Sequence, residues 1–168
     1  MPSILSFVFL LLTLFLLSGK TCFAQIKINE IFPNPAEDGN EWVELYNSGQ
    51  ETIKLNEYYL VDEKDNKYSL SDLDSVGSQK LIVFEYEGDG WLNNSGDLLI
   101  LLKNDNEIEE YSFGDIGEGK SIGRSPDGAD NWITFNAPSK GESNAEPTNT
   151  PTPSPTNEPT VQPTNTPT

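Results

Sequence analysis

The apolar residues between positions 26 and 113 recur at a period of two rather than 3.6, and this alternation limits the fold more than any other feature. Turn-forming residues interrupt it about every eight to twelve positions, as is typical of all-β sandwiches. Helix is expected to be nearly absent, and the sequence predicts an all-β, antiparallel sandwich. The expected strands are 26–32, 41–47, 52–55, 58–62, 66–70, 79–86, 97–103 and 107–113.

One of these strands carries an uninterrupted apolar run from Leu98 to Leu102, with turn residues on both sides. Such a run predicts a central strand that is covered on both faces. The residues that follow, Asn104 to Asn106, predict a short hairpin loop into the next strand.

Residues 1–24 have the pattern of a secretion signal. An apolar run, Ile4 to Leu17, is shorter than the about 20 residues that span a bilayer, and small side chains before and at Ala24 predict cleavage after Ala24. The chain is therefore expected to be secreted or displayed at the cell surface. Two alternatives remain open: an uncleaved membrane anchor, and a lipoprotein anchor at Cys22, which the charged Lys20 disfavours.

The composition changes sharply near Asn144. Residues 25–144 contain enough aromatic and aliphatic side chains for one folded domain. Residues 145–168 are almost wholly Pro, Thr, Asn, Ser and Glu, and the sequence Pro147 to Thr152 repeats at Pro163 to Thr168. Such a segment cannot form a core, so we expect a disordered, low-complexity stalk or linker with polyproline II character.

The residue types that are missing restrict the chemistry. The chain has no histidine, and its one cysteine lies within residues 1–24. Thiolate chemistry, an internal disulfide and the commonest general base and zinc ligand are thereby excluded from residues 25–168. We expect no cofactor and no enzymatic activity. A small carboxylate-dependent hydrolase is the least favoured alternative, because no strand end gathers a nucleophile, a base and an orienting partner.

The charge is strongly acidic, with 27 Asp and Glu against 10 Lys and Arg and a net charge of -17. Such a field repels nucleic acid and anionic lipid, so neither is an expected partner, and no membrane insertion is expected after processing. Solubility outside the cell explains the acidity more simply than recognition of a cationic partner does.

The order of short motifs resembles the lamin tail domain, an immunoglobulin-like module of nuclear lamins that also occurs in exported bacterial proteins. The resemblance covers residues 26–144. Two positions depart from the family pattern: Glu57 stands where Gly usually precedes an aromatic residue, and the closing element reads Ser139-Lys140-Gly141. The motifs are Ile28-Asn29-Glu30-Ile31, Asn34-Pro35, Glu41 to Asn47, Ser95-Gly96-Asp97, Ser121 to Arg124, Asp127-Gly128, Trp132 and Pro138 to Asn144.

The resemblance implies an immunoglobulin-like β-sandwich and a non-catalytic module for attachment or protein contact, often joined to hydrolases or surface proteins. The motif residues are expected to be structural. They are Asn29, Glu30, Trp42, Glu44, Asn47, Arg124 and Trp132.

The second strand has two contrasting faces. Val43 and Leu45 point one way, and Trp42, Glu44 and Tyr46 point the other. With the aliphatic pair in the core, the Trp-Glu-Tyr stripe is either a recognition surface or is covered by the late segment that contains Arg124 and Trp132. We favour the covered stripe, because an open one would be an unusually large apolar patch.

Arg124, the single arginine, can bind a carboxylate with both arms of its guanidinium. We hypothesise that it pairs with Glu44 or Glu30 and pins the late segment to the early strands.

Three acidic loops, 37–40, 62–66 and 87–90, offer oxygen ligands that calcium prefers. None has the spacing of an EF-hand, and Asp, Asn and Gly are also what turns require, so no metal site is predicted.

Three functions remain, in order of preference. The first is a non-catalytic exported or cell-surface module that contacts a protein or polysaccharide. The second is a spacer or targeting domain of a larger exported hydrolase, and the third is the small hydrolase above.

Overall fold

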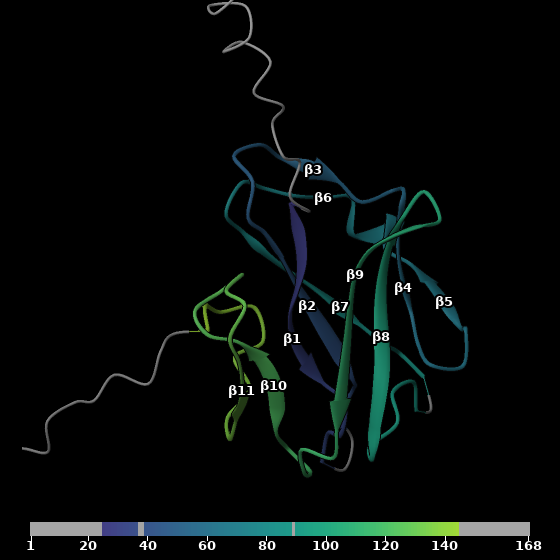
Figure 1. Cartoon of the computed structure of the whole chain (residues 1–168), viewed down its shortest axis with the longest axis vertical. Coiled ribbons are helices and arrows are strands. Elements are labelled where there is room, and N and C mark those ends of the chain that lie inside the picture. Colours follow the sequence, from purple (N-terminus) through teal and green to yellow (C-terminus); the bar gives the residue numbers. More distant parts are fainter. Residues whose placement is uncertain (1–24, 37–38, 89, 145–168) are drawn as a thin grey trace, which may run out of the picture.

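The computed structural model describes residues 25–36, 39–88 and 90–144, which form eleven strands and one short 3-10 turn, η1 (Ser71–Leu73) (Figure 1). Two antiparallel sheets pack face to face, so the predicted all-β, immunoglobulin-like sandwich is confirmed. The predicted signal (1–24), its cleavage site and the Pro/Thr-rich segment (145–168) lie outside the described residues.

The first sheet has five strands in the order β11-β10-β1-β2-β7, and the second has four in the order β5-β4-β8-β9. A small pair, β3 with β6, lies at one end of the sandwich (Figure 1). The strands of the first sheet are β1 (Ile26–Phe32), β2 (Trp42–Asn47), β7 (Leu81–Glu85), β10 (Ser121–Arg124) and β11 (Trp132–Phe135). Those of the second sheet are β4 (Tyr58–Val61), β5 (Lys67–Ser69), β8 (Gly96–Lys103) and β9 (Asn106–Gly114), and the small pair is β3 (Ile53–Lys54) and β6 (Ser75–Val76).

The core lies between the two sheets and is mainly aliphatic. Val43 and Leu45 of β2 are fully buried there, so the aliphatic side of the second strand is the inner one. Leu99 and Leu101 of β8 meet them from the second sheet. Each such side chain stabilises the fold by about 1.5–3 kcal/mol on burial.

Strand β8 is central, as predicted, because it lies between β4 and β9. The expectation that both of its faces are covered is wrong. Leu99 and Leu101 are buried, whereas Leu98, Ile100 and Leu102 on the other face are only half-buried. The first sheet packs on one face of the second, and no other described layer covers the opposite face.

The loop after β8 is the predicted hairpin. Lys103 pairs with Asn106, and the two residues between them, Asn104 and Asp105, have φ angles of 48° and 60°. Two consecutive left-handed residues form the turn that matches the twist of a hairpin, and Asn and Asp adopt this conformation more readily than most residues.

Three strands were not foreseen: β6, β10 and β11. Strand β10 reads Ser-Ile-Gly-Arg, which lacks apolar alternation, and it is held by pairing with β1 and β11. Gly123 is required in it, because a Cβ there would come within 2.9 Å of the Asn29 carbonyl oxygen. Within the described ranges, no helix is long and apolar enough to cross a membrane.

Candidate functional site

The Trp-Glu-Tyr stripe of β2 faces away from the core, and late parts of the chain cover it. Trp42 is 3% exposed and stacks on Phe32 with ring centres 5.5 Å apart. Tyr46 packs against Gly128, where a Cβ would lie 2.7 Å from the tyrosine ring. Because φ of Gly128 is +68°, a side chain is disfavoured there on both counts. The stripe is therefore not an open recognition surface.

Glu30 and Glu44 are cross-strand neighbours beneath this cover, and both are fully buried. Glu30 accepts hydrogen bonds from the Ser121 hydroxyl, the Ser139 amide (3.1 Å) and the Ser139 hydroxyl (2.6 Å). Glu44 accepts one from the Gly141 amide at 2.8 Å. These donors come largely from residues 136–144, which we call the closing segment.

Asn29 sits at a β-bulge between Ile28 and Glu30, where the register of β1 against β2 shifts. Its amide nitrogen donates to Glu44 and to Asp127, both at 2.9 Å, and its side-chain oxygen accepts the Gly128 amide at 2.9 Å. The extra residue also turns Glu30 to the outer face and lets Ile31 enter the core.

Burial raises the pKa of Glu44 from 4.5 to about 7, even though hydrogen bonds from Asn29 and the Gly141 amide favour its charged form. The nearby Glu30 and Asp127 carboxylates also raise it. The described residues place no histidine or thiol beside this pair. The two serine hydroxyls that reach Glu30 donate to it, and these polar contacts fasten one segment of the chain to another.

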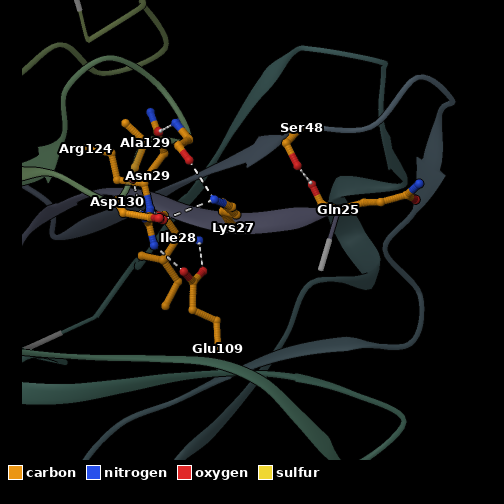
Figure 2. Close-up of polar contacts among 10 residues, drawn as sticks. Gln25, Lys27, Ile28, Asn29, Ser48, Glu109, Arg124, Ala129 and Asp130 are labelled. Carbon is orange, nitrogen blue, oxygen red and sulfur yellow. Dashed lines mark hydrogen bonds and ion pairs between the residues drawn. The ribbon is translucent and has the colours of Figure 1, made fainter. Parts of the chain in front are cut away.

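Arg124 lies on the inner face of the first sheet, on the same face of β10 as Ile122 and opposite Trp132 of β11. Figure 2 shows Arg124 with its partners Ile28 and Glu109. Its Nε donates to the Ile28 carbonyl at 2.8 Å, and its guanidinium pairs with Glu109 of β9. The hypothesis of a pair with Glu30 or Glu44 is therefore wrong, because both carboxylates lie on the outer face. The contact with β1 does join the late segment to an early strand.

The contact of Arg124 with β9 is extended by aromatic rings. The guanidinium carbon lies 4.7 Å from the centre of the Trp132 ring, which stacks on Tyr111 at 3.6 Å. The Glu109 carboxylate also accepts the Ile28 amide at 2.6 Å. Arg124 and Trp132 thus join the two sheets along one edge and do not take part in covering the stripe.

Asn47 lies at the end of β2 and is fully buried. Its amide nitrogen donates to the carbonyls of Glu51 (2.7 Å) and Gly77 (2.9 Å), and its oxygen accepts the Gly49 amide at 2.9 Å. It therefore ties β2 to the turn after it and to the residues next to β6.

The acidic loops are only partly described, since residues 37, 38 and 89 are outside the described ranges. In the 62–66 loop, Asp62 accepts the amides of Lys64 (2.9 Å) and Asn66 (2.8 Å), which is turn chemistry. The described residues contain no group of three or more His, Cys, Asp or Glu that could hold a metal ion.

The opposite edge of the sandwich is open. It lies between β5, the last strand of the second sheet, and β7, the last strand of the first. A trough of about 620 Å³ runs between them, and its walls include aromatic rings, a cation and several carboxylates. These residues include Lys67, Tyr68, Asp72, Phe84, Tyr86 and Glu87.

Trp91 supports the aromatic wall from beneath. Its ring centre lies 4.9 Å from that of Tyr68, 5.2 Å from that of Phe84 and 5.9 Å from that of Tyr86. Glu41, the residue before β2, holds this tryptophan by accepting hydrogen bonds from the amides of Trp91 and Leu92. Tyr68, Phe84 and Tyr86 themselves are half-buried and pack against the core, with part of each ring open to the trough. Sequence reasoning placed them in strands without indicating that they converge.

The family model described as Lamin Tail Domain matches residues 21–115, which is more than half of the chain. The chain belongs to the lamin tail domain family. The match to the family model ends before β10, although β10, β11 and the closing segment are built into the same domain. Searches of curated proteins and of solved structures found no match.

Lamin tail domains are non-catalytic, immunoglobulin-like domains that usually mediate protein interactions. The non-catalytic character of the family is consistent with the expectation of no enzymatic activity.

Proposed function

We propose that this chain is a non-catalytic, exported or cell-surface attachment module that holds a protein or polysaccharide partner at its β5/β7 edge. The observation that carries the proposal is the trough itself. Three half-buried aromatic side chains that line the trough meet there on a buried tryptophan, whereas the aromatic stripe of β2 is covered. Rigid aromatic rings with polar tips are common anchors of recognition surfaces.

Export is supported by the sequence. Residues 1–24 have the pattern of a signal, and the later chain has neither cysteine nor histidine and an acidic composition. Mass spectrometry of protein collected outside the producing cells should give a chain that begins at Gln25. Recovery of the chain only inside the cells would contradict export.

A second function, an accessory domain that targets an exported hydrolase, is favoured by the Pro/Thr-rich composition of residues 145–168. Such segments are typical linkers between independently folded units. The same trough would then bring the hydrolase to its substrate.

The attachment function can be tested by screening the full chain against glycan and protein arrays and then measuring each positive with a Tyr86→Ala variant. Removing this ring should weaken binding at least about tenfold, as loss of an anchor residue does. Tyr59→Ala is the matched control, because Tyr59 is also half-exposed but lies on β4, outside the trough. Binding that Tyr86→Ala leaves intact, or that Tyr59→Ala removes, would place the site elsewhere.

A further inference from the structure

The free edge of β7 carries unpaired backbone groups beside the aromatic trough. Strand β7 pairs with β2 through a regular ladder, in which the Tyr86 amide donates to the Glu41 carbonyl and the Asn47 amide donates to the Lys80 carbonyl. Alternate residues of an antiparallel pair exchange these bonds. The backbone groups of Leu81, Val83 and Glu85 therefore turn away from β2, and no other described strand pairs with them.

Strand β5, across the trough, has the same arrangement. The Leu70 amide donates to the Tyr58 carbonyl, and the Asp62 amide donates to the Asn66 carbonyl. The backbone groups of Lys67 and Ser69 between these positions therefore also turn outward. Two free strand edges thus border one trough.

Natural sheets normally blunt such an edge with charged residues, proline or a covering loop, because it is a template for another strand. In β7, the four residues Leu81 to Phe84 are all apolar and only half-buried. Lys80 and Glu85 bear charge only at the two ends. The edge is thus left in a form that can receive an extended chain.

We propose that the occupant is an extended, cationic segment of a partner protein, which adds to β7 as an antiparallel strand. The inference rests on the attachment function proposed above and names its partner class. Backbone pairing would supply the affinity, and side chains on one face of the added strand would lie on Tyr68, Phe84 and Tyr86.

The charge of the rim selects a cationic segment. Asp72 and Glu87 are exposed at the trough, and Glu85 there is paired with Lys140. Lys67, the basic residue in the trough wall, is paired with Asp105, so the exposed charge at the trough is negative. The net charge of -17 also disfavours a second copy of this chain as the added strand, because the two copies would repel each other.

The test uses the full chain and a fluorescent synthetic peptide of alternating valine and lysine, with binding followed by anisotropy. The peptide should bind, and its affinity should fall as salt is raised. A peptide of alternating valine and glutamate should not bind, nor should the valine-lysine peptide when alternate amides are N-methylated. N-methylation removes the donors that a strand needs and leaves the charge unchanged.

Val83→Pro removes one outward amide while sparing the ladder with β2, and an edge strand accepts proline at such a position. This substitution should weaken the affinity for the valine-lysine peptide about tenfold or more. Thr134→Pro is the matched control on the other edge of the same sheet. There the Ser125 amide donates to the Asn131 carbonyl, so the Thr134 amide also turns outward. Thr134→Pro should leave binding unchanged.

Each contrary outcome overturns a different statement. Unchanged peptide binding by Val83→Pro, or equal binding of the N-methylated peptide, rejects strand addition. If the chain binds cello- or chito-oligosaccharides but not the valine-lysine peptide, the cationic-strand proposal is rejected and the attachment function is kept. If it binds neither probe, both proposals are rejected. Dimerisation of the chain that Val83→Pro abolishes would make a second copy the occupant. The N-methylated peptide decides the question on the unaltered protein if Val83→Pro fails to fold.

Discussion

The two sides of this sandwich differ in how the chain covers them. Along β1 and β10, residues 121–144 seal the domain through buried polar contacts, with Arg124 on the inner face and the closing segment on the outer face. Along β5 and β7, no described segment pairs with either edge. The first sheet thus has buried polar contacts from its own chain around β1 and β10, whereas β7 has an edge beside the aromatic trough that no described strand pairs with; the edge of β11 is likewise unpaired among the described strands but borders no such trough.

This contrast separates two kinds of polar residue. Those on the sealed side, such as Glu30 and Glu44, are buried and satisfied by backbone and hydroxyl donors. Those at the open edge, such as Asp72 and Glu87, are exposed. Substitutions on the sealed side should therefore act on stability, whereas substitutions at the open edge should act on binding.

The largest effect is expected at Arg124. Arg124→Ala leaves the Glu109 carboxylate and two backbone carbonyls without their donor, and breaking a buried pair in this way costs about 3–5 kcal/mol. Urea denaturation should show this loss, and Arg124→Lys should lower the unfolding midpoint less, because one ammonium group cannot reach all three partners.

Lys67→Ala at the open edge is the comparison for Arg124→Ala. Its ion pair with Asp105 is exposed and should contribute about 1 kcal/mol or less. Equal losses from the two substitutions would remove the distinction between the sealed side and the open edge.

A smaller effect is expected from the pH dependence of Glu44. The folded protein keeps the Glu44 proton up to about pH 7, whereas the unfolded chain releases it near pH 4.5. The stability from the raised pKa is therefore complete below pH 4.5 and is lost as the pH rises through 7. Glu44→Gln should flatten the fall in the free energy of unfolding across this window.

Burial also raises the pKa of Glu41. Its contribution to the pH dependence should be the same in the Glu44→Gln variant and in the unaltered chain. Urea denaturation at several pH values measures the difference between them. Identical slopes for the variant and the unaltered chain would mean that Glu44 does not keep its proton under the closing segment.

The smallest effect concerns Lys140, by which the closing segment reaches β7. Its hydrogen bond to Glu85, at 2.7 Å, lowers the pKa of that exposed carboxyl. Lys140→Ala should raise this pKa, as NMR titration of Glu85 can measure. It should change stability by less than about 1 kcal/mol.

The contribution of Glu85 is present above pH 4.5 and is lost as the pH falls through its lower folded pKa. Any loss on Lys140→Ala should therefore vanish in acid. If Lys140→Ala lowered the free energy of unfolding by several kcal/mol, the closing segment would contribute to stability at β7 as well.

The strands were predictable where local chemistry decides them. Alternation marks β1, β2 and β9, and Asn104-Asp105 marks the hairpin. The partner of Arg124 was not predictable, because a regular strand would place Glu30 on the same face as Ile28. The bulge at Asn29 reverses that face, and nothing local in the sequence indicates it.

The trough at the β5/β7 edge could not be predicted from the sequence for a different reason. Tyr68 and Phe84 belong to different sheets, and they meet because β5 and β7 are both last in their sheets. Sheet order depends on long-range pairing, and periodicity does not report it.

Asn144, the last described residue, is 1% exposed and bonds through its amide to Asp127 at 2.9 Å and through its side chain to the Asn29 carbonyl at 3.4 Å. Mechanical tension applied to the Pro/Thr-rich residues beyond it would enter the domain here and pass directly to β1, in the middle of the first sheet. With a partner held at β7, the load would then cross the β1–β2 and β2–β7 ladders to reach it, so these two ladders and the partner contact would bear the tension in series.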